Sequence, residues 1–270
     1  MKTIALFNNK GGVGKTTLAY HLGFMFAELG RRVLFADLDP QANLSTMCIA
    51  DDRLEEIWKL QPRPTVYGAV DRLRRGLGDI EMLSPESVGS RISIVPGDLQ
   101  LCELEDLLSE QWPKCLDREE RAFRVTTSLH RLVADVGKRT GAHLAVLDVG
   151  PTFGAINRAA LIAADYVIVP VAPDLFSMQG LENVGPRLSA WRVSGLIVVI
   201  ARHRWSSHCR QAGWRPSDTS SRGTRRWRAA QSRRSNDGSI GCRRPTGGRL
   251  ACHLGPTISM SMRTIIVSPS

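Results

Sequence analysis

A glycine-rich segment with two lysines, at residues 10–17, constrains this 270-residue chain more than any other feature. It reads Lys-Gly-Gly-Val-Gly-Lys-Thr-Thr and lies between an apolar run at residues 3–7 and a helical pattern of apolar residues that begins at Leu18. A strand, a glycine turn and a helix in this order are typical of a phosphate-binding loop, because glycine lets successive backbone N–H groups point at one anion. The positive end of the following helix strengthens such a site. The sequence therefore predicts an α/β fold that binds a phosphorylated ligand near its amino end.

The positions of this loop have different expected roles. Lys15 can reach the β- and γ-phosphate oxygens of a nucleotide, and the hydroxyl of Thr16 can coordinate Mg²⁺. The usual motif would place glycine at position 9, where this chain has Asn9, and a second lysine stands at the loop entrance instead. The predicted nucleotide-binding residues are Lys10, Gly11, Gly12, Val13, Gly14, Lys15, Thr16 and Thr17.

Acidic residues follow two further apolar runs. The sequence Asp-Leu-Asp-Pro-Gln occupies residues 37–41, and residues 144–147 lead into Asp148. Carboxylates at strand ends beside a phosphate loop are natural ligands for Mg²⁺, directly or through water, so we predict a metal site formed by Thr16, Asp37 and Asp148. Asp39 is two residues beyond Asp37 and is expected on the same side of an extended segment. There it can orient the water molecule that attacks a γ-phosphate.

These motifs together resemble the ParA/MinD family of ATPases, whose phosphate loop is the deviant Walker A motif. The resemblance covers roughly residues 1–192 and includes the helix and strand at 157–170 and the segment Phe-Ser-Met-Gln-Gly-Leu at 176–181. It implies a three-layer P-loop NTPase fold with a mostly parallel sheet, and an enzyme that binds MgATP, dimerises when ATP is bound and hydrolyses ATP slowly. It also implies that Lys10 is the signature lysine that contacts nucleotide across the dimer interface, so the predicted catalytic residues are Lys10, Lys15 and Asp39. The chain departs from the family at Gly150, which stands in place of the first of two paired prolines.

The same resemblance implies a cellular role. Members of the family act in DNA or plasmid segregation or in cargo positioning in the cytoplasm, with a ParB-like activator and nonspecific DNA as partners. A MinD-like positioning ATPase is an alternative, but it would need a C-terminal amphipathic basic helix, which the pattern of residues 261–270 does not indicate. A nonfunctional remnant that keeps only the nucleotide loop is another alternative. Iron–sulfur reductases share the loop, yet they need cluster-binding cysteines that this chain lacks at suitable spacing. We expect no membrane contact, because no apolar stretch is long enough to cross a bilayer.

Each predicted site residue also has a simpler interpretation. An aspartate at the end of a strand can serve only to cap the following helix or turn. That alternative stays open for Asp37, Asp39 and Asp148. Outside this motif, Lys10 would be read as an ordinary solvated loop lysine.

Composition divides the chain at about residue 200. The whole chain has a formal net charge of +10, but residues 201–270 contain 14 arginines, no lysine and only two acidic residues. The first 200 residues are therefore slightly acidic. Arginine without lysine, scattered tryptophan and cysteine, and no sustained helix or strand period favour a sequence that is translated out of frame or otherwise scrambled after about residue 192–201. An authentic, disordered basic tail that binds nucleic acid is the alternative.

We accordingly expect a nucleotide-binding domain at residues 1–200, incomplete at its C-terminal side, followed by an irregular or disordered tail at 201–270. Strands are expected at residues 3–7, 32–36, 92–95, 143–148, 166–170 and 195–200. One long helix is expected over residues 117–139, with Asp117 as its cap and Glu120 three residues later. Residues 50–91 are expected to form a polar excursion with one short helix near 66–75.

Overall fold

Strands and helices alternate along the chain in the computed structural model, which describes residues 1–171, 184–191 and 263–267. All of these residues belong to one compact unit, Met1–Ala201 with Ser261–Ser270. The strands are β1 (Lys2–Leu6), β2 (Val33–Asp37), β3 (Glu86–Ser87), β4 (Ile92–Val95), β5 (Leu144–Asp148), β6 (Tyr166–Pro170) and β7 (Arg263–Val267). The helices are α1 (Lys15–Glu28), α2 (Asn43–Cys48), α3 (Asp51–Lys59), α4 (Val66–Arg74), the 3₁₀ turn η1 (Leu99–Cys102), α5 (Glu103–Lys114), α6 (Glu120–Thr126), α7 (Ser128–Thr140) and α8 (Ala155–Ala163). Residues 184–191 are also helical.

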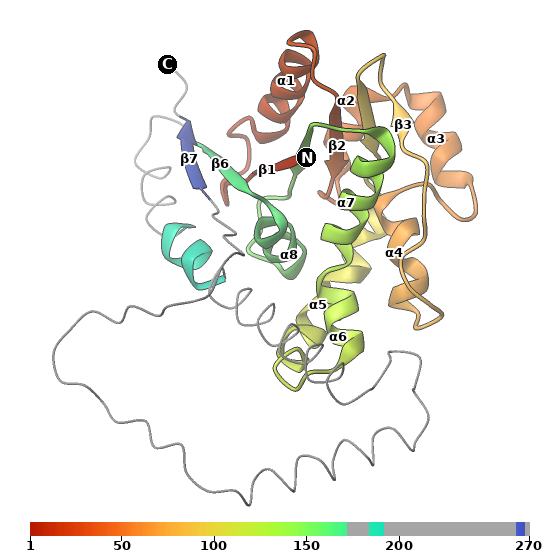
Figure 1. Ribbon diagram of the computed structural model, residues 1–270, viewed down its shortest axis with the longest axis vertical. Helices are drawn as coiled ribbons and strands as arrows, with labels where there is room; N and C mark the ends of the chain where they lie inside the picture. Colours follow the sequence, from red (N-terminus) through yellow and green to blue (C-terminus); the bar gives the residue numbers. More distant parts are fainter. Residues whose placement is uncertain (172–183, 192–262, 268–270) are drawn as a thin grey trace, which may run out of the picture. The chain divides into compact units, whose positions relative to one another are not determined.

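The described strands form one sheet in the order β3-β4-β2-β5-β1-β6-β7. Every neighbouring pair is parallel except β3 and β4, which are antiparallel. A parallel connection needs a crossover, which here is made by the helices between strands. In Figure 1, α1 and α8 lie on opposite sides of the sheet strands β1 and β6. The predicted mostly parallel sheet is confirmed.

Side chains that alternate along each central strand divide the core into two layers. On β2, Val33 and Phe35 pack into one apolar cluster with residues of α1, α2 and α3. The intervening Leu34 and Ala36 join a second cluster, with residues of α4 to α8. Because successive strand residues face opposite sides, a strand that is apolar throughout must be covered on both faces. The expected three-layer α/β fold is therefore confirmed.

Helix α1 approaches the sheet closely at a glycine. A Cβ atom added to Gly23 would lie only 2.0 Å from Cζ of Phe35, whose ring is fully buried. The absence of a side chain at this position lets the helix that follows the phosphate loop settle directly on β2.

Gly23→Ala is therefore expected to lower the free energy of unfolding by about 1–2 kcal/mol. Overpacking against a buried ring outweighs the gain of about 1 kcal/mol that alanine brings to a helix. Urea unfolding measures the change. In a Phe35→Leu background, which removes the ring, the same substitution should cost much less, and an equal cost in both backgrounds would show that the ring is not the cause.

The structure differs from the sequence-based expectations at several places. The predicted helix over 117–139 is two helices, α6 and α7, which meet at Thr127. Thr126 and Thr127 donate hydroxyl hydrogen bonds to the carbonyl oxygens of Ala122 and Phe123, four residues back, at 2.8 and 2.6 Å. Such bonds bend a helix, which explains the break. The residue before α6 is Glu119, and Asp117 does not cap the helix.

Two further differences concern the excursion and the tail. The short helix near 66–75 is confirmed as α4, but residues 51–59 form an additional helix, α3. The expected strand at 195–200 lies outside the described residues, as does most of the segment 201–270. Within that segment, residues 263–267 form β7, which pairs with β6. The expected irregular or disordered tail therefore contains a paired strand at these five positions.

Candidate nucleotide-binding site

The loop between β1 and α1 has the backbone of an anion-binding turn. Gly12 and Gly14 adopt left-handed conformations, with φ of 72° and 77°. A side chain would find open space at both positions, so glycine is required by the backbone and not by crowding. Gly14 is the N-cap of α1, and no side chain caps this helix or places an acidic group in its first turn. The first N–H groups of α1 therefore remain without an internal counter-charge.

Lys15, the first residue of α1, is buried beneath this turn, and its Nζ lies 3.4 Å from the carbonyl oxygen of Lys10. Burial lowers the pKa of Lys15, while the nearby carboxylates of Asp148 and Asp39 raise it. The structure thus gathers one lysine and two aspartates that are far apart in the sequence.

Asn8, which sequence reasoning did not single out, orients the entrance of the loop. Its side-chain amide donates to the carbonyl oxygen of Pro170, at the end of β6, at 2.6 Å. Its Oδ1 accepts the N–H of Lys10 at 3.0 Å. The position of Lys10 is therefore tied to the sheet through a buried side chain.

Asp37 and Asp148 lie beside each other at the carboxyl ends of adjacent strands. They are register partners in the parallel pair of β2 and β5. Asp148 is almost fully buried, and neither of its carboxylate oxygens accepts a hydrogen bond of good geometry among the described residues, although the Thr16 side chain and the Lys15 ammonium group lie near enough to stabilise its charge. Burial raises the pKa of Asp148 to about 6; the nearby Thr16 side chain and Lys15 offset the rise in part. Lys15 and Thr16 offset only part of the cost of burying this carboxylate, and a bound cation would offset more of it.

Asp37 has different surroundings, because its oxygens are already occupied. Oδ2 accepts the backbone N–H and the hydroxyl of Ser45 at 2.8 and 2.7 Å, and Oδ1 accepts the N–H of Asp39 at 3.3 Å. Burial, followed by the charge of Asp148, raises the pKa of Asp37 to about 7. These contacts are those of the capping alternative, since Ser45 lies in the first turn of α2. Asp37 can still influence a bound metal without coordinating it, through a water molecule or by orienting Asp148.

Asp39 faces the loop that follows β5. A Cβ atom added to Gly150 would lie 3.5 Å from the carboxylate of Asp39. Asp39 Oδ1 also accepts the N–H of Gln41 at 3.0 Å, which fixes the turn beyond β2. The three predicted aspartates do meet at one edge of the sheet, but Asp37 and Asp39 contact different partners because β2 ends at Asp37.

Two polar residues that the sequence analysis did not identify hold the site together. The hydroxyl of Ser45 donates to Asp37 and accepts the N–H of Gly97 at 2.8 Å, so it joins β2 to the segment after β4. Asn157, on α8, donates to the carbonyl oxygens of Gly150 and Thr152 at 2.7 and 2.6 Å. A buried serine and asparagine give no periodic or motif signal, so only the fold reveals these roles.

The donor set fits Mg²⁺ bound together with a nucleotide better than Mg²⁺ alone. No group of three or more His, Cys, Asp or Glu side chains that could hold a metal occurs among the described residues. Mg²⁺ is commonly bound by one or two carboxylates together with phosphate oxygens and water. Asp148 with Thr16 supplies such a partial shell.

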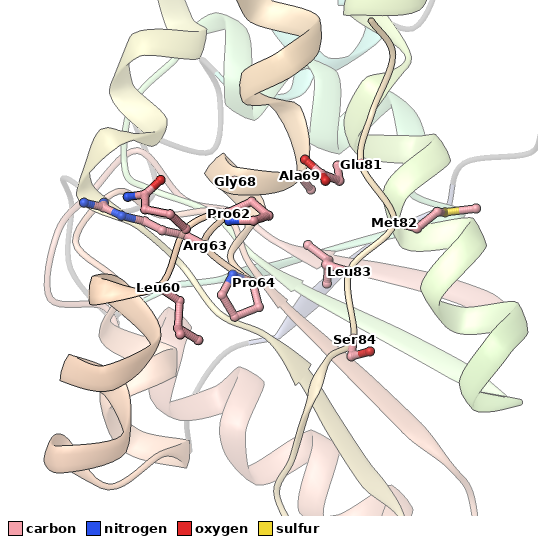
Figure 2. Close-up of a pocket in the computed structure, with 11 residues that line it drawn as sticks. Leu60, Pro62, Arg63, Pro64, Gly68, Ala69, Glu81, Met82, Leu83 and Ser84 are labelled. Carbon is pink, nitrogen blue, oxygen red and sulfur yellow. The ribbon is translucent and has the colours of Figure 1, made fainter.

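An apolar pocket of about 320 Å³ lies elsewhere in the fold. It is lined by residues 60–64, between α3 and α4, by Gly68 and Ala69, and by residues 81–84 (Figure 2). None of the predicted nucleotide-binding residues lines it, so we assign it no role in the site. Separately, the described helices include none that is both long and apolar enough to span a membrane.

Comparisons with known proteins identify a protein family and individual relatives for the N-terminal part of this chain. A sequence profile of the AAA domain family matches residues 1–192. The chromosome partitioning protein ParA of Caulobacter vibrioides is 30% identical over 185 residues, which cover 68% of this chain and 61% of that protein. The chain spans between 43% and 61% of the length of the first curated relatives that it matches.

Solved structures resemble the same region. Protein DIP2308 from Corynebacterium diphtheriae superposes with a TM-score of 0.70 at 32% identity, over 77% of this chain and 73% of that chain. Cobyrinic acid a,c-diamide synthase from Mycobacterium smegmatis, determined with a bound ATP analog and magnesium, has a TM-score of 0.54 at 26% identity, over 70% of this chain and 68% of that chain.

The raised pKa of the buried Asp148 predicts a pH-dependent stability. Its pKa is about 6 in the folded protein against 3.8 when unperturbed, so the folded state binds more protons between these values and stability falls as the pH rises through them. Asp148→Asn should therefore stabilise the nucleotide-free protein at pH 8, by on the order of 2 kcal/mol, and should have little effect at pH 4.

Urea unfolding of wild type and variant at the two pH values, without magnesium, measures this difference. The exposed Asp52 provides the control, since Asp52→Asn should change stability little at either pH. An Asp148→Asn variant that is less stable than wild type at pH 8 would show that Lys15 and Thr16 compensate the burial of this carboxylate fully.

Proposed function

Because this chain belongs to the AAA domain family, and within it to the ParA-type P-loop ATPases, we propose that it binds MgATP through residues 10–17 and hydrolyses it slowly. The observation that best supports this proposal is a pair of neighbouring charges, one positive and one negative, that the protein satisfies only in part. The first turn of α1 has no internal capping group, and Asp148 beside it accepts no hydrogen bond of good geometry among the described residues. An anion at the first and a cation at the second, held together as a magnesium–phosphate complex, would satisfy both.

Different residues of the proposed site have different roles in the transfer of the γ-phosphoryl group to water. The amides of residues 11–17 and the ammonium group of Lys15 hold the phosphate oxygens. The Thr16 hydroxyl and Asp148 are the proposed metal ligands, with Asp37 behind them. Mg²⁺, when bound, would neutralise charge on the β- and γ-phosphates. Asp39, which stands against the backbone of Gly150, is the proposed group that orients the attacking water.

The biological proposal follows the family. We infer that ATP drives formation of a homodimer in which Lys10 of each copy contacts the nucleotide of the other. The dimer would serve DNA or plasmid partitioning or cargo positioning in the cytoplasm, with a ParB-like activator and nonspecific DNA as partners. The ParA relative from Caulobacter vibrioides is named a chromosome partitioning protein. We further propose that residues 1–200 carry the nucleotide domain.

Substitution of the two loop lysines should separate binding from later steps. Lys15→Ala removes a buried cation from the phosphates and is expected to weaken ATP binding by about 100-fold or more. Lys10→Ala should leave ATP binding nearly intact and should remove hydrolysis or ATP-dependent dimerisation. Calorimetric titration measures the affinity, phosphate release measures hydrolysis, and light scattering with and without ATP measures the dimer.

Lys59→Ala is the matched control, because this lysine is exposed on α3 and pairs only with a neighbour on its own helix among the contacts described. It should behave as wild type in all three measurements. Equal ATP affinity of wild type and Lys15→Ala would exclude the loop as the nucleotide site. A folded protein that binds ATP but neither dimerises nor hydrolyses it would favour the alternative of a nonfunctional remnant.

A further inference from the structure

A carboxylate from a distant helix occupies the N-terminus of α8. Glu105, on α5, accepts the N–H of Ala155 at Oε1 and the N–H of Ile156 at Oε2, the latter at 2.9 Å. Both donors are in the first turn of α8, about fifty residues further along the chain. Hydrogen bonds from helix amides to an ionised carboxylate are stronger than those to a neutral acceptor, and the helix dipole adds to them. Glu105 therefore fixes where α8 begins.

The residue before α8 is adapted to this contact. Gly154 is the N-cap, with φ of −72° and ψ of 176°, a conformation that alanine also adopts readily. A Cβ atom at this position would nevertheless lie 2.5 Å from Oε1 of Glu105. A larger residue at 154 is therefore allowed by the backbone angles but would displace the Glu105 carboxylate from the start of α8.

The start of α8 in turn holds the loop that follows Asp148. Asn157, in the first turn of α8, binds the carbonyl oxygens of Gly150 and Thr152. Gly150 is the residue against which Asp39 stands. A continuous set of contacts thus leads from Glu105 through α8 and Asn157 to the backbone beside the proposed water-orienting carboxylate.

We propose that Glu105 is a positioning residue for ATP hydrolysis, which sets the loop at residues 150–154 against Asp39. This role rests on the proposed function of the site. Glu105 touches neither the phosphate loop nor Lys15 in the contacts that the structure describes, so it acts on the catalytic step and not on binding of the nucleotide. A small displacement of the loop is enough to lower the rate, because catalysis depends on the alignment of the water and the γ-phosphate.

The test compares ATP affinity with turnover in Glu105→Ala and Glu105→Gln. Glu105→Ala should leave the dissociation constant of ATP within about threefold of wild type and lower kcat by about tenfold or more. Glu105→Gln keeps one acceptor oxygen and should recover part of the rate. Glu110→Ala is the control: Glu110 lies on the same helix, but it is exposed and pairs with Lys114, so its loss should change neither quantity.

A double-mutant cycle tests the contact itself. Gly154→Ala should displace the Glu105 carboxylate and lower kcat in the wild-type background, but it should cost little more in a Glu105→Ala background, where its Cβ has room. Amide hydrogen exchange of residues 150–156 should quicken in each single variant.

Three outcomes would count against the proposal. A Glu105→Ala protein that hydrolyses ATP at the wild-type rate, with faster exchange at 155–156, would reduce Glu105 to a structural cap and overturn the proposal. A parallel loss of ATP affinity and kcat would place its effect on binding and overturn it as well. Failure of the folded wild type to bind ATP at all would contradict the proposed function and this role together, and the titration distinguishes that case from the other two.

Discussion

Charge buried at the carboxyl ends of parallel strands is the constraint on which the rest of this structure depends. Asp37 and Asp148 are brought side by side by the register of β2 and β5, and both have raised pKa values because water is excluded from them. The fold offsets the burial of Asp37 through Ser45 and offsets the burial of Asp148 only in part, through Lys15 and Thr16. A domain tolerates such a cost mainly where a ligand relieves it, which is the reason that we propose a ligand site at this edge of the sheet.

The surrounding elements serve to keep that edge in place. Apolar side chains cover both faces of the sheet: α1 to α3 pack on one face and α4 to α8 on the other. Gly23 brings α1 onto Phe35, so the phosphate loop is carried by a helix in direct contact with the strand that ends in Asp37. On the other side, α8 carries Asn157 to the loop after Asp148. Each polar group at the edge is thus supported from a different layer.

The sequence was sufficient for the parts of the fold that repeat a pattern. The phosphate loop, the apolar strands and the aspartates at their ends follow from local motifs, and the five expected strands within the described residues lie within one residue of their predicted bounds. Contacts between distant segments were not predictable. Glu105, Ser45 and Asn157 are single polar residues whose partners lie up to about fifty positions away, and no periodicity marks them. The break at Thr127 was missed because the apolar stripe continues across it.

Calorimetric titration of ATP into the folded chain, with and without magnesium, tests the central claim most directly. The account predicts that ATP binds, that magnesium strengthens the binding several-fold, and that this magnesium dependence is lost when Asp148 is replaced by asparagine. Absence of binding, or binding that magnesium and Asp148→Asn leave unchanged, would contradict the assignment of this edge of the sheet as a magnesium–nucleotide site.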